Sequence, residues 1–181
     1  MMDEVARLRL LAAIVDMLNK AGSWTGRTHI QKFIYFAQEL LGLPTGYEFV
    51  LYQRGPYCFE LDADIRTLRS IGAVDISPAP PYGPSYVPTE LGKSILRLSP
   101  VGEEMTHSLT ALSKSLGRPK QARDLELLAT TLFAMNEGNE LDEDIIQRVL
   151  SLKPQFQRSE VEDGLSEVRG LRVQFRSGGS F

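Results

Sequence analysis

Basic side chains gather in two neighbouring stretches of the sequence. Arg27, His29 and Lys32 lie at the start of one predicted helix. Arg54 lies in a turn beyond that helix, just before Tyr57. Such a cluster could hold a phosphate or carboxylate, because the first amides of a helix point outward and carry partial positive charge. The alternative is a solvated surface with one or two ion pairs, so we treat these five residues as candidates for binding a protein partner or nucleic acid.

Cys58 is the candidate nucleophile. It follows Pro56 in the first turn of another predicted helix, where the helix dipole would lower the pKa of the thiol. A cysteine nucleophile needs a base, and neither His29 nor His107 lies in a recognisable catalytic motif. The alternative is a small buried side chain that packs against the first helix. Because the phosphate-loop and hydrolase motifs are also missing, we expect no enzyme, with a reactive Cys58 as the exception.

Composition excludes several classes of protein. One cysteine and two histidines leave little material for a metal centre, so we expect no metal and no cofactor. With 20 Lys+Arg against 23 Asp+Glu, the net charge of −3 removes the global reason for tight binding to a phosphate backbone. The N-terminus carries two early acids, unlike a signal peptide, and the longest apolar run, residues 10–15, is too short to span a bilayer. We therefore expect a cytoplasmic protein with no membrane partner.

The first part of the chain predicts the element order of a winged helix-turn-helix domain. Thr28 and Gln31 have the spacing of a capping box that would open the second helix. Pro56 is placed as the first residue of the third helix. The order is helix, helix, short strand, helix, β-hairpin. The predicted helices are 3–21, 28–41, 56–71, 89–98 and 100–117, and the predicted strands are 47–52, 73–77 and 85–87.

The pattern restarts after residue 117. Amphipathic stretches predict helices at 123–136 and 142–152, and Ser159 with Glu162 has the spacing of a capping box that opens a third. Residues 171–173 are a candidate terminal strand. We thus predict a mainly α protein with a small β-hairpin wing, in which 1–117 is a winged-helix-like domain, 118–175 a C-terminal three-helix unit and 176–181 a flexible tail. An acidic run at 137–144 and three C-terminal bases, Arg169, Arg172 and Arg176, are further candidate contacts.

Several segments resemble a known family. HIQKFIYFAQ at 29–38, YEFVLYQRGPYCFELDADIRTL at 47–68, YVPTELGKSIL at 86–96 and the helical segment 142–171 are similar to the YwgA-like bacterial proteins. The first segments are more distantly similar to the Panacea (SocA-like) domain, from which the chain departs at Arg54, where that family usually has tyrosine. The resemblance implies a winged-helix-like fold in prokaryotes. Panacea domains serve as antitoxins or adaptors, so it also implies a regulatory role.

The residues expected to meet DNA argue against DNA binding. The third helix would be the recognition helix, and its first turns hold Glu60, Asp62 and Asp64, which would repel phosphates unless they point elsewhere. The wing loop, 78–84, has no Lys or Arg. We therefore expect a non-catalytic protein-interaction or regulatory module, as an accessory of a defence or toxin–antitoxin system by family analogy. The alternative is a DNA-binding regulator, and a homodimer is compatible with either.

Aromatic residues are dense between 33 and 57. Tyr35 and Phe36 follow Phe33 too closely to share one helix face, so at least one of them should leave the first core and pack on the strand or the C-terminal unit. Most aromatic stripes on helices are core. An aromatic side chain left exposed beside the basic residues would mark a surface for a partner.

Overall fold

The computed structural model describes residues 2–81, 83–116, 122–138 and 141–176. Within these residues the chain is mainly helical, with two separate two-stranded antiparallel sheets, and none of its helices has the length and apolar character needed to cross a membrane. The elements are α1 (Glu4–Lys20), α2 (Arg27–Leu41), β1 (Val50–Tyr52), β2 (Gly55–Tyr57), α3 (Phe59–Ser70), β3 (Val74–Ser77), β4 (Ser85–Pro88), α4 (Glu90–Leu98), α5 (Glu103–Ser115), α6 (Ala122–Asn136), α7 (Asp142–Leu152) and α8 (Arg158–Arg176).

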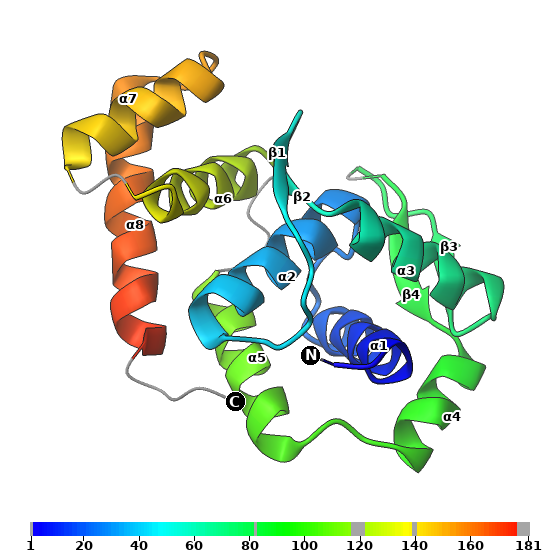
Figure 1. Ribbon diagram of the computed structural model, residues 1–181. Coiled ribbons are helices and arrows are strands. Elements are labelled where there is room, and N and C mark those ends of the chain that lie inside the picture. Colours follow the sequence, from blue (N-terminus) through cyan, green and yellow to red (C-terminus); the bar gives the residue numbers. More distant parts are fainter. Residues whose placement is uncertain (1, 82, 117–121, 139–140, 177–181) are drawn as a thin grey trace.

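The central helix of the molecule is α2. Figure 1 shows it between α1 and α3 on one side and α6 and α8 on the other. Its aromatic side chains are buried on more than one face, and Phe36 is completely enclosed. Tyr35 packs against Phe49, just before β1, and against Phe133 of α6, with ring centroids 5.0 and 6.5 Å away. One helix therefore joins the N-terminal elements to the C-terminal helices.

The predicted start of α2 is wrong by two residues. The N-cap is Gly26, not Thr28, and no side chain caps the helix. Trp24 lies against Gly26 so closely that a Cβ there would be 2.3 Å from an indole carbon, which excludes a larger capping residue. Gln31, expected to complete a capping box, instead uses its amide to bind the backbone of Cys58. The hydrogen bonds to Cys58, which is distant in sequence, thus replace the expected cap between Gln31 and the start of α2.

A second hairpin, β1–β2, was not predicted. The expected strand 47–52 is shortened to Val50–Tyr52 and pairs with Gly55–Tyr57 in the register Leu51 to Pro56. Pro56 is therefore a strand residue and does not open α3. That helix begins at Phe59, and the Sγ of Cys58 accepts a hydrogen bond from the Leu61 amide as its N-cap.

The predicted β3–β4 hairpin is confirmed. Val74 pairs with Pro88 and Ser77 with Ser85. Thr89, where the predicted helix 89–98 begins, caps α4 by accepting from the Gly92 amide at 3.1 Å. The mainly α fold with a small β-hairpin is thus confirmed.

The C-terminal helices share their core with the rest of the chain. One face of α6, with Leu128 and Leu132, belongs to the main core around α2. Its opposite face contributes Leu127 and Ala134 to a small core with α7 and α8. Residues 125–132 are all buried, including the polar Glu126, Thr130 and Thr131, so α6 is more enclosed than its amphipathic pattern indicates. The division into 1–117 and 118–175 stays a prediction, and residues 117–121 lie outside the described residues.

The last helix departs from the predictions at both of its ends. It starts at Arg158, where the Gln157 amide donates to Glu160 Oε2 at 2.8 Å, so the expected Ser159 and Glu162 box is displaced by two residues. The candidate strand 171–173 is helical instead, because Leu171 and Phe175 continue the apolar face into the main core. Arg176 ends the helix, and the rest of the predicted tail, 177–181, lies outside the described residues.

Candidate functional site

A groove of about 380 Å³ lies between the start of α2 and the β1–β2 hairpin. We call it the α2–hairpin groove. It brings together residues that are 32 positions apart in the sequence, from the first turns of α2 to the start of α3. The lining residues combine cationic, aromatic and amide side chains: Arg27, Thr28, Gln31, Lys32, Tyr52, Gln53, Arg54, Gly55, Tyr57 and Phe59.

Two polar side chains of α2 hold the hairpin in place. The Gln31 amide donates to the Cys58 carbonyl and accepts from the Cys58 amide, both at 2.9 Å, as a neighbouring strand would. Lys32 Nζ donates to the Pro56 carbonyl at 2.6 Å and is only 1% exposed. Burial lowers the pKa of Lys32 to about 8, and the carboxylate of Glu126 offsets part of this shift.

A second buried lysine holds the hairpin from the C-terminal side. Lys153, just after α7, pairs with Glu126 of α6 at 2.7 Å and also donates to the Gln53 carbonyl. Both members of this ion pair are at least nine-tenths buried. The position of the hairpin turn, and with it one wall of the groove, therefore depends on α6 and on the segment after α7.

Three aromatic rings form the outer wall of the groove. Tyr52, Tyr57 and Phe59 contact one another with ring centroids 5.0 to 5.6 Å apart. Tyr52 and Phe59 stay 48% and 59% exposed. The guanidinium of Arg27 lies over the Tyr57 ring and donates to its hydroxyl. The sequence predicts that an exposed aromatic side chain beside the basic residues marks a surface for a partner, and Tyr52 and Phe59 are such side chains.

The structure brings four of the five predicted site residues into this groove. Arg27, Lys32, Arg54 and Tyr57 line it. His29 does not, because it is buried and its ring packs edge-on against Trp24 with centroids 4.5 Å apart. Tyr52 and Phe59 complete the groove, and sequence reasoning did not select them for it. Phe59 follows Tyr57 by two residues, a spacing that puts side chains on one face of an extended segment, and this signal could have found it.

The three cations of the groove differ in how much of their charge is available to a ligand. Arg27 is engaged by Asp62, with Nε 2.6 Å from the carboxylate. Lys32 is enclosed by the hairpin it supports. Arg54, at the turn of the hairpin, is exposed and makes no ion pair with any described residue. The exposed charge of the groove is therefore concentrated on Arg54, with Arg27 partly neutralised beside it.

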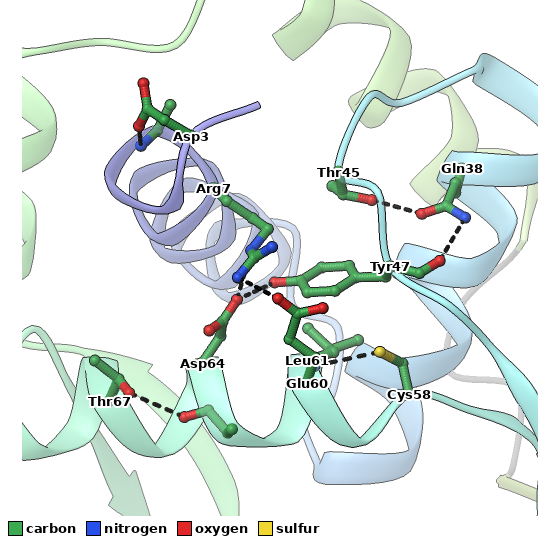
Figure 2. Close-up of polar contacts among 12 residues, drawn as sticks. Asp3, Arg7, Gln38, Thr45, Tyr47, Cys58, Glu60, Leu61, Asp64 and Thr67 are labelled. Atoms are coloured by element: carbon green, nitrogen blue, oxygen red, sulfur yellow. Dashed lines mark hydrogen bonds and ion pairs between the residues drawn. The ribbon is translucent and has the colours of Figure 1, made fainter. Parts of the chain in front are cut away.

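Of the three carboxylates in the first turns of α3, those of Asp62 and Asp64 are buried, whereas that of Glu60 is half exposed. Figure 2 shows Arg7 of α1 between two of them, with its nitrogens 2.6 Å from Glu60 and 2.8 Å from Asp64. The Tyr47 hydroxyl also donates to Asp64 at 2.7 Å. Asp62 faces Arg27 and is buried as well. The expected repulsion of phosphates by three exposed carboxylates is thus wrong for Asp62 and Asp64, which are neutralised inside the fold.

Cys58 has the properties of a packed residue. It is 2% exposed, and burial raises the pKa of its thiol, which outweighs the lowering by the amides at the start of α3. The expectation that the helix dipole would lower this pKa is therefore wrong. Among the described parts of the chain, no group of three or more His, Cys, Asp or Glu residues is arranged to hold a metal ion.

The charged segments of the C-terminal helices pair with one another. Acids of the 137–144 run bind arginines of α7 and α8, and Arg169 is one of these arginines. Arg172 donates to the side chain of Asn136. These groups therefore serve contacts within the chain; the pairs are Glu137 with Arg148, Asp142 with Arg169 and Glu143 with Arg158.

Comparison with protein-family models and with curated proteins finds no match to this chain.

Proposed function

We propose that this protein is a non-catalytic interaction module of the prokaryotic cytoplasm, and that it binds an acidic segment of a partner protein in the α2–hairpin groove. The element order α1, α2, α3 and the β3–β4 wing supports a winged helix-turn-helix-like domain, as in the YwgA-like proteins that the sequence resembles. By the same analogy, the module would be an accessory of a defence or toxin–antitoxin system.

The observation that carries this proposal is the convergence of Arg54, Arg27 and the exposed aromatic rings on one cavity. Aromatic and arginine side chains are enriched where protein partners bind, because they present large rigid surfaces that also form hydrogen bonds. The buried charge of Lys32 and the first amides of α2 add positive potential at the base of the groove. An acidic side chain next to an aromatic or apolar one matches this arrangement in both charge and shape.

Selection from a displayed library of short peptides tests the proposal. We expect the wild-type protein to enrich peptides in which Asp or Glu adjoins an aromatic residue. Fluorescence anisotropy with an enriched peptide should show at least tenfold weaker binding by Arg54→Glu. Arg69→Glu is the matched control, because Arg69 is an exposed arginine of α3 outside the groove and should leave the affinity unchanged. Enrichment without acidic residues, or equal binding by Arg54→Glu, would contradict the proposal.

DNA binding is the second candidate function, and one observation favours it. With Asp62 and Asp64 buried, the exposed face of α3 carries Arg66 and Arg69, whose side chains are 70% and 54% exposed. A recognition helix presents such a face to the major groove. Binding to duplex DNA would weaken steeply with salt, because phosphate contacts release counterions.

A gel-shift titration separates the two candidates. If the protein is a DNA-binding regulator, Arg69→Glu loses binding to duplex DNA while Arg54→Glu keeps most of it. If it is the interaction module proposed above, duplex DNA is not bound and the same pair of variants shows the opposite order in the peptide assay. Lys32→Glu does not test either candidate function, because Lys32 is buried against the hairpin and the substitution would unfold the hairpin.

A further inference from the structure

α4 presents an apolar stripe to solvent. Leu91, Ile95 and Leu98 are 52%, 36% and 88% exposed, and they repeat at the spacing that puts side chains on one helix face. This spacing ordinarily marks the face that a helix buries. The residue of α4 that is buried is instead Gly92, on another side of the helix.

The close contact at Gly92 holds the stripe outward. A Cβ at Gly92 would lie 2.1 Å from the Ala73 carbonyl oxygen, so the helix backbone is pressed directly against the segment before β3. Thr89 fixes the start of α4 to the same segment, since its amide donates to Ala73 O at 3.1 Å and its hydroxyl to Gly72 O at 2.6 Å. Successive helix residues are turned by roughly 100°, so docking through Gly92 leaves Leu91 and its stripe directed away from that contact. The exposure is a result of how α4 is anchored.

We propose that α4 of one molecule packs antiparallel against α4 of a second copy, through the stripe of Leu91, Ile95 and Leu98. A two-fold axis beside the middle of the helix brings Leu91 of each copy against Leu98 of the other and places the two Ile95 side chains at the centre. A self-complementary patch of this kind is what a two-fold interface requires. The inference does not depend on the α2–hairpin groove, which contains no residue of α4.

Charge order along the helix identifies the occupant as a second copy. Glu90 lies at the first position of α4 and Arg97 near its end, on the same flank of the stripe at 100° per residue. An antiparallel copy puts Glu90 of one helix beside Arg97 of the other, twice by symmetry. Within one molecule Glu90 pairs with Lys93 at 2.8 Å, and Arg97 donates to Ser94. An apolar partner of another kind would not require this arrangement of charges.

Sedimentation velocity over a dilution series tests the self-association. The wild-type protein should form a dimer that dissociates on dilution, and Leu98→Glu should remain a monomer. Val173→Glu is the matched control, because Val173 is 73% exposed on α8 and lies outside the stripe; this variant should dimerise like the wild type. A wild-type monomer at every concentration, or a dimer of Leu98→Glu as strong as the wild-type dimer, would refute the proposal.

Charge reversal tests the antiparallel orientation. Glu90→Arg alone places like charges together in the dimer, and so does Arg97→Glu alone, so each variant should dimerise more weakly than the wild type. An equimolar mixture of the two variants should dimerise again. Glu90→Arg of one chain then faces Arg97→Glu of the other at one end, and the unchanged Arg97 and Glu90 face each other at the other end. A mixture that stays monomeric would overturn the antiparallel pairing. Both substitutions lie on the surface, so folding is not at issue.

Discussion

Gly55→Ala tests how the hairpin turn is seated on α6. Gly55 has φ +79°, in the left-handed region, and its Cβ would lie 2.8 Å from Thr130 Oγ1 and 3.4 Å from the Glu126 carbonyl oxygen. The substitution therefore has two costs. A left-handed backbone costs an alanine about 1–2 kcal/mol, and overpacking of a close contact costs about 1–3 kcal/mol more. We expect the free energy of unfolding to fall by about 2–5 kcal/mol.

Gly42→Ala separates the two costs. Gly42 ends α2 with a similar φ of +68°, but a Cβ there would meet nothing within 4 Å. This variant should lose only the backbone part, about 1–2 kcal/mol. Thr130→Ala removes the oxygen that obstructs Gly55→Ala and sacrifices no hydrogen bond among the described residues. The double variant Gly55→Ala/Thr130→Ala should therefore be more stable than the sum of the single effects predicts.

Urea unfolding followed by circular dichroism measures the wild type and the four variants. The order of stability should be wild type, Gly42→Ala, then Gly55→Ala, with positive coupling to Thr130→Ala. Equal costs for Gly42→Ala and Gly55→Ala would refute the close seating of the turn on α6. The same change should weaken peptide binding in the groove, because Arg54 lies next to the displaced residue.

Three further predictions concern buried groups. Burial lowers the pKa of Lys32 to about 8, so between pH 8 and 10.5 the unfolded chain binds a proton that the folded chain has lost, and the free energy of unfolding rises with pH. Lys32→Met should remove about 3 kcal/mol of this rise, measured by urea unfolding at several pH values. An effect of the substitution that does not change with pH would contradict the lowered pKa. Glu126→Gln leaves Lys153 buried without its partner and should lower the free energy of unfolding by about 3 kcal/mol, whereas the double variant Glu126→Leu/Lys153→Met should lower it less. If urea unfolding finds the double variant less stable than Glu126→Gln, the pair is not buried as described. Native Cys58 should be alkylated at neutral pH more slowly than a free model thiol and at the model rate in guanidinium, and a faster native rate would revive the enzyme hypothesis.

Local signals in the sequence predicted most elements. The acids at the start of α1, the cap Thr89 and the glycine that ends α2 all act within one turn of a helix, so nearby residues suffice to recognise them. The β3–β4 hairpin was recognisable for the same reason, since its strands are separated by a short loop rich in proline.

The errors have a common physical cause. Gln31 matched a capping box, but its amide found the backbone of Cys58, 27 residues away, and that contact satisfies two buried groups at once. The same long-range contact draws Pro56 into a strand opposite Leu51. Residues 171–173 were likewise misassigned as a strand, because packing of Leu171 on the main core continues α8 through them. In each case a tertiary partner outweighed a local preference.

The sequence by itself determined the helical class, the β3–β4 hairpin and four residues of the candidate site, because apolar periodicity and residue type are local properties. Only the tertiary structure decided how those site residues are used. Arg7, 57 residues from Asp64, neutralises a carboxylate that the sequence predicted at the DNA-facing end of a recognition helix. Lys32 binds the backbone of the hairpin, whereas Arg54 remains exposed at the turn of the hairpin. Which charge is buried and which is left for a partner depends on contacts between distant segments, and those exist only once the chain has packed.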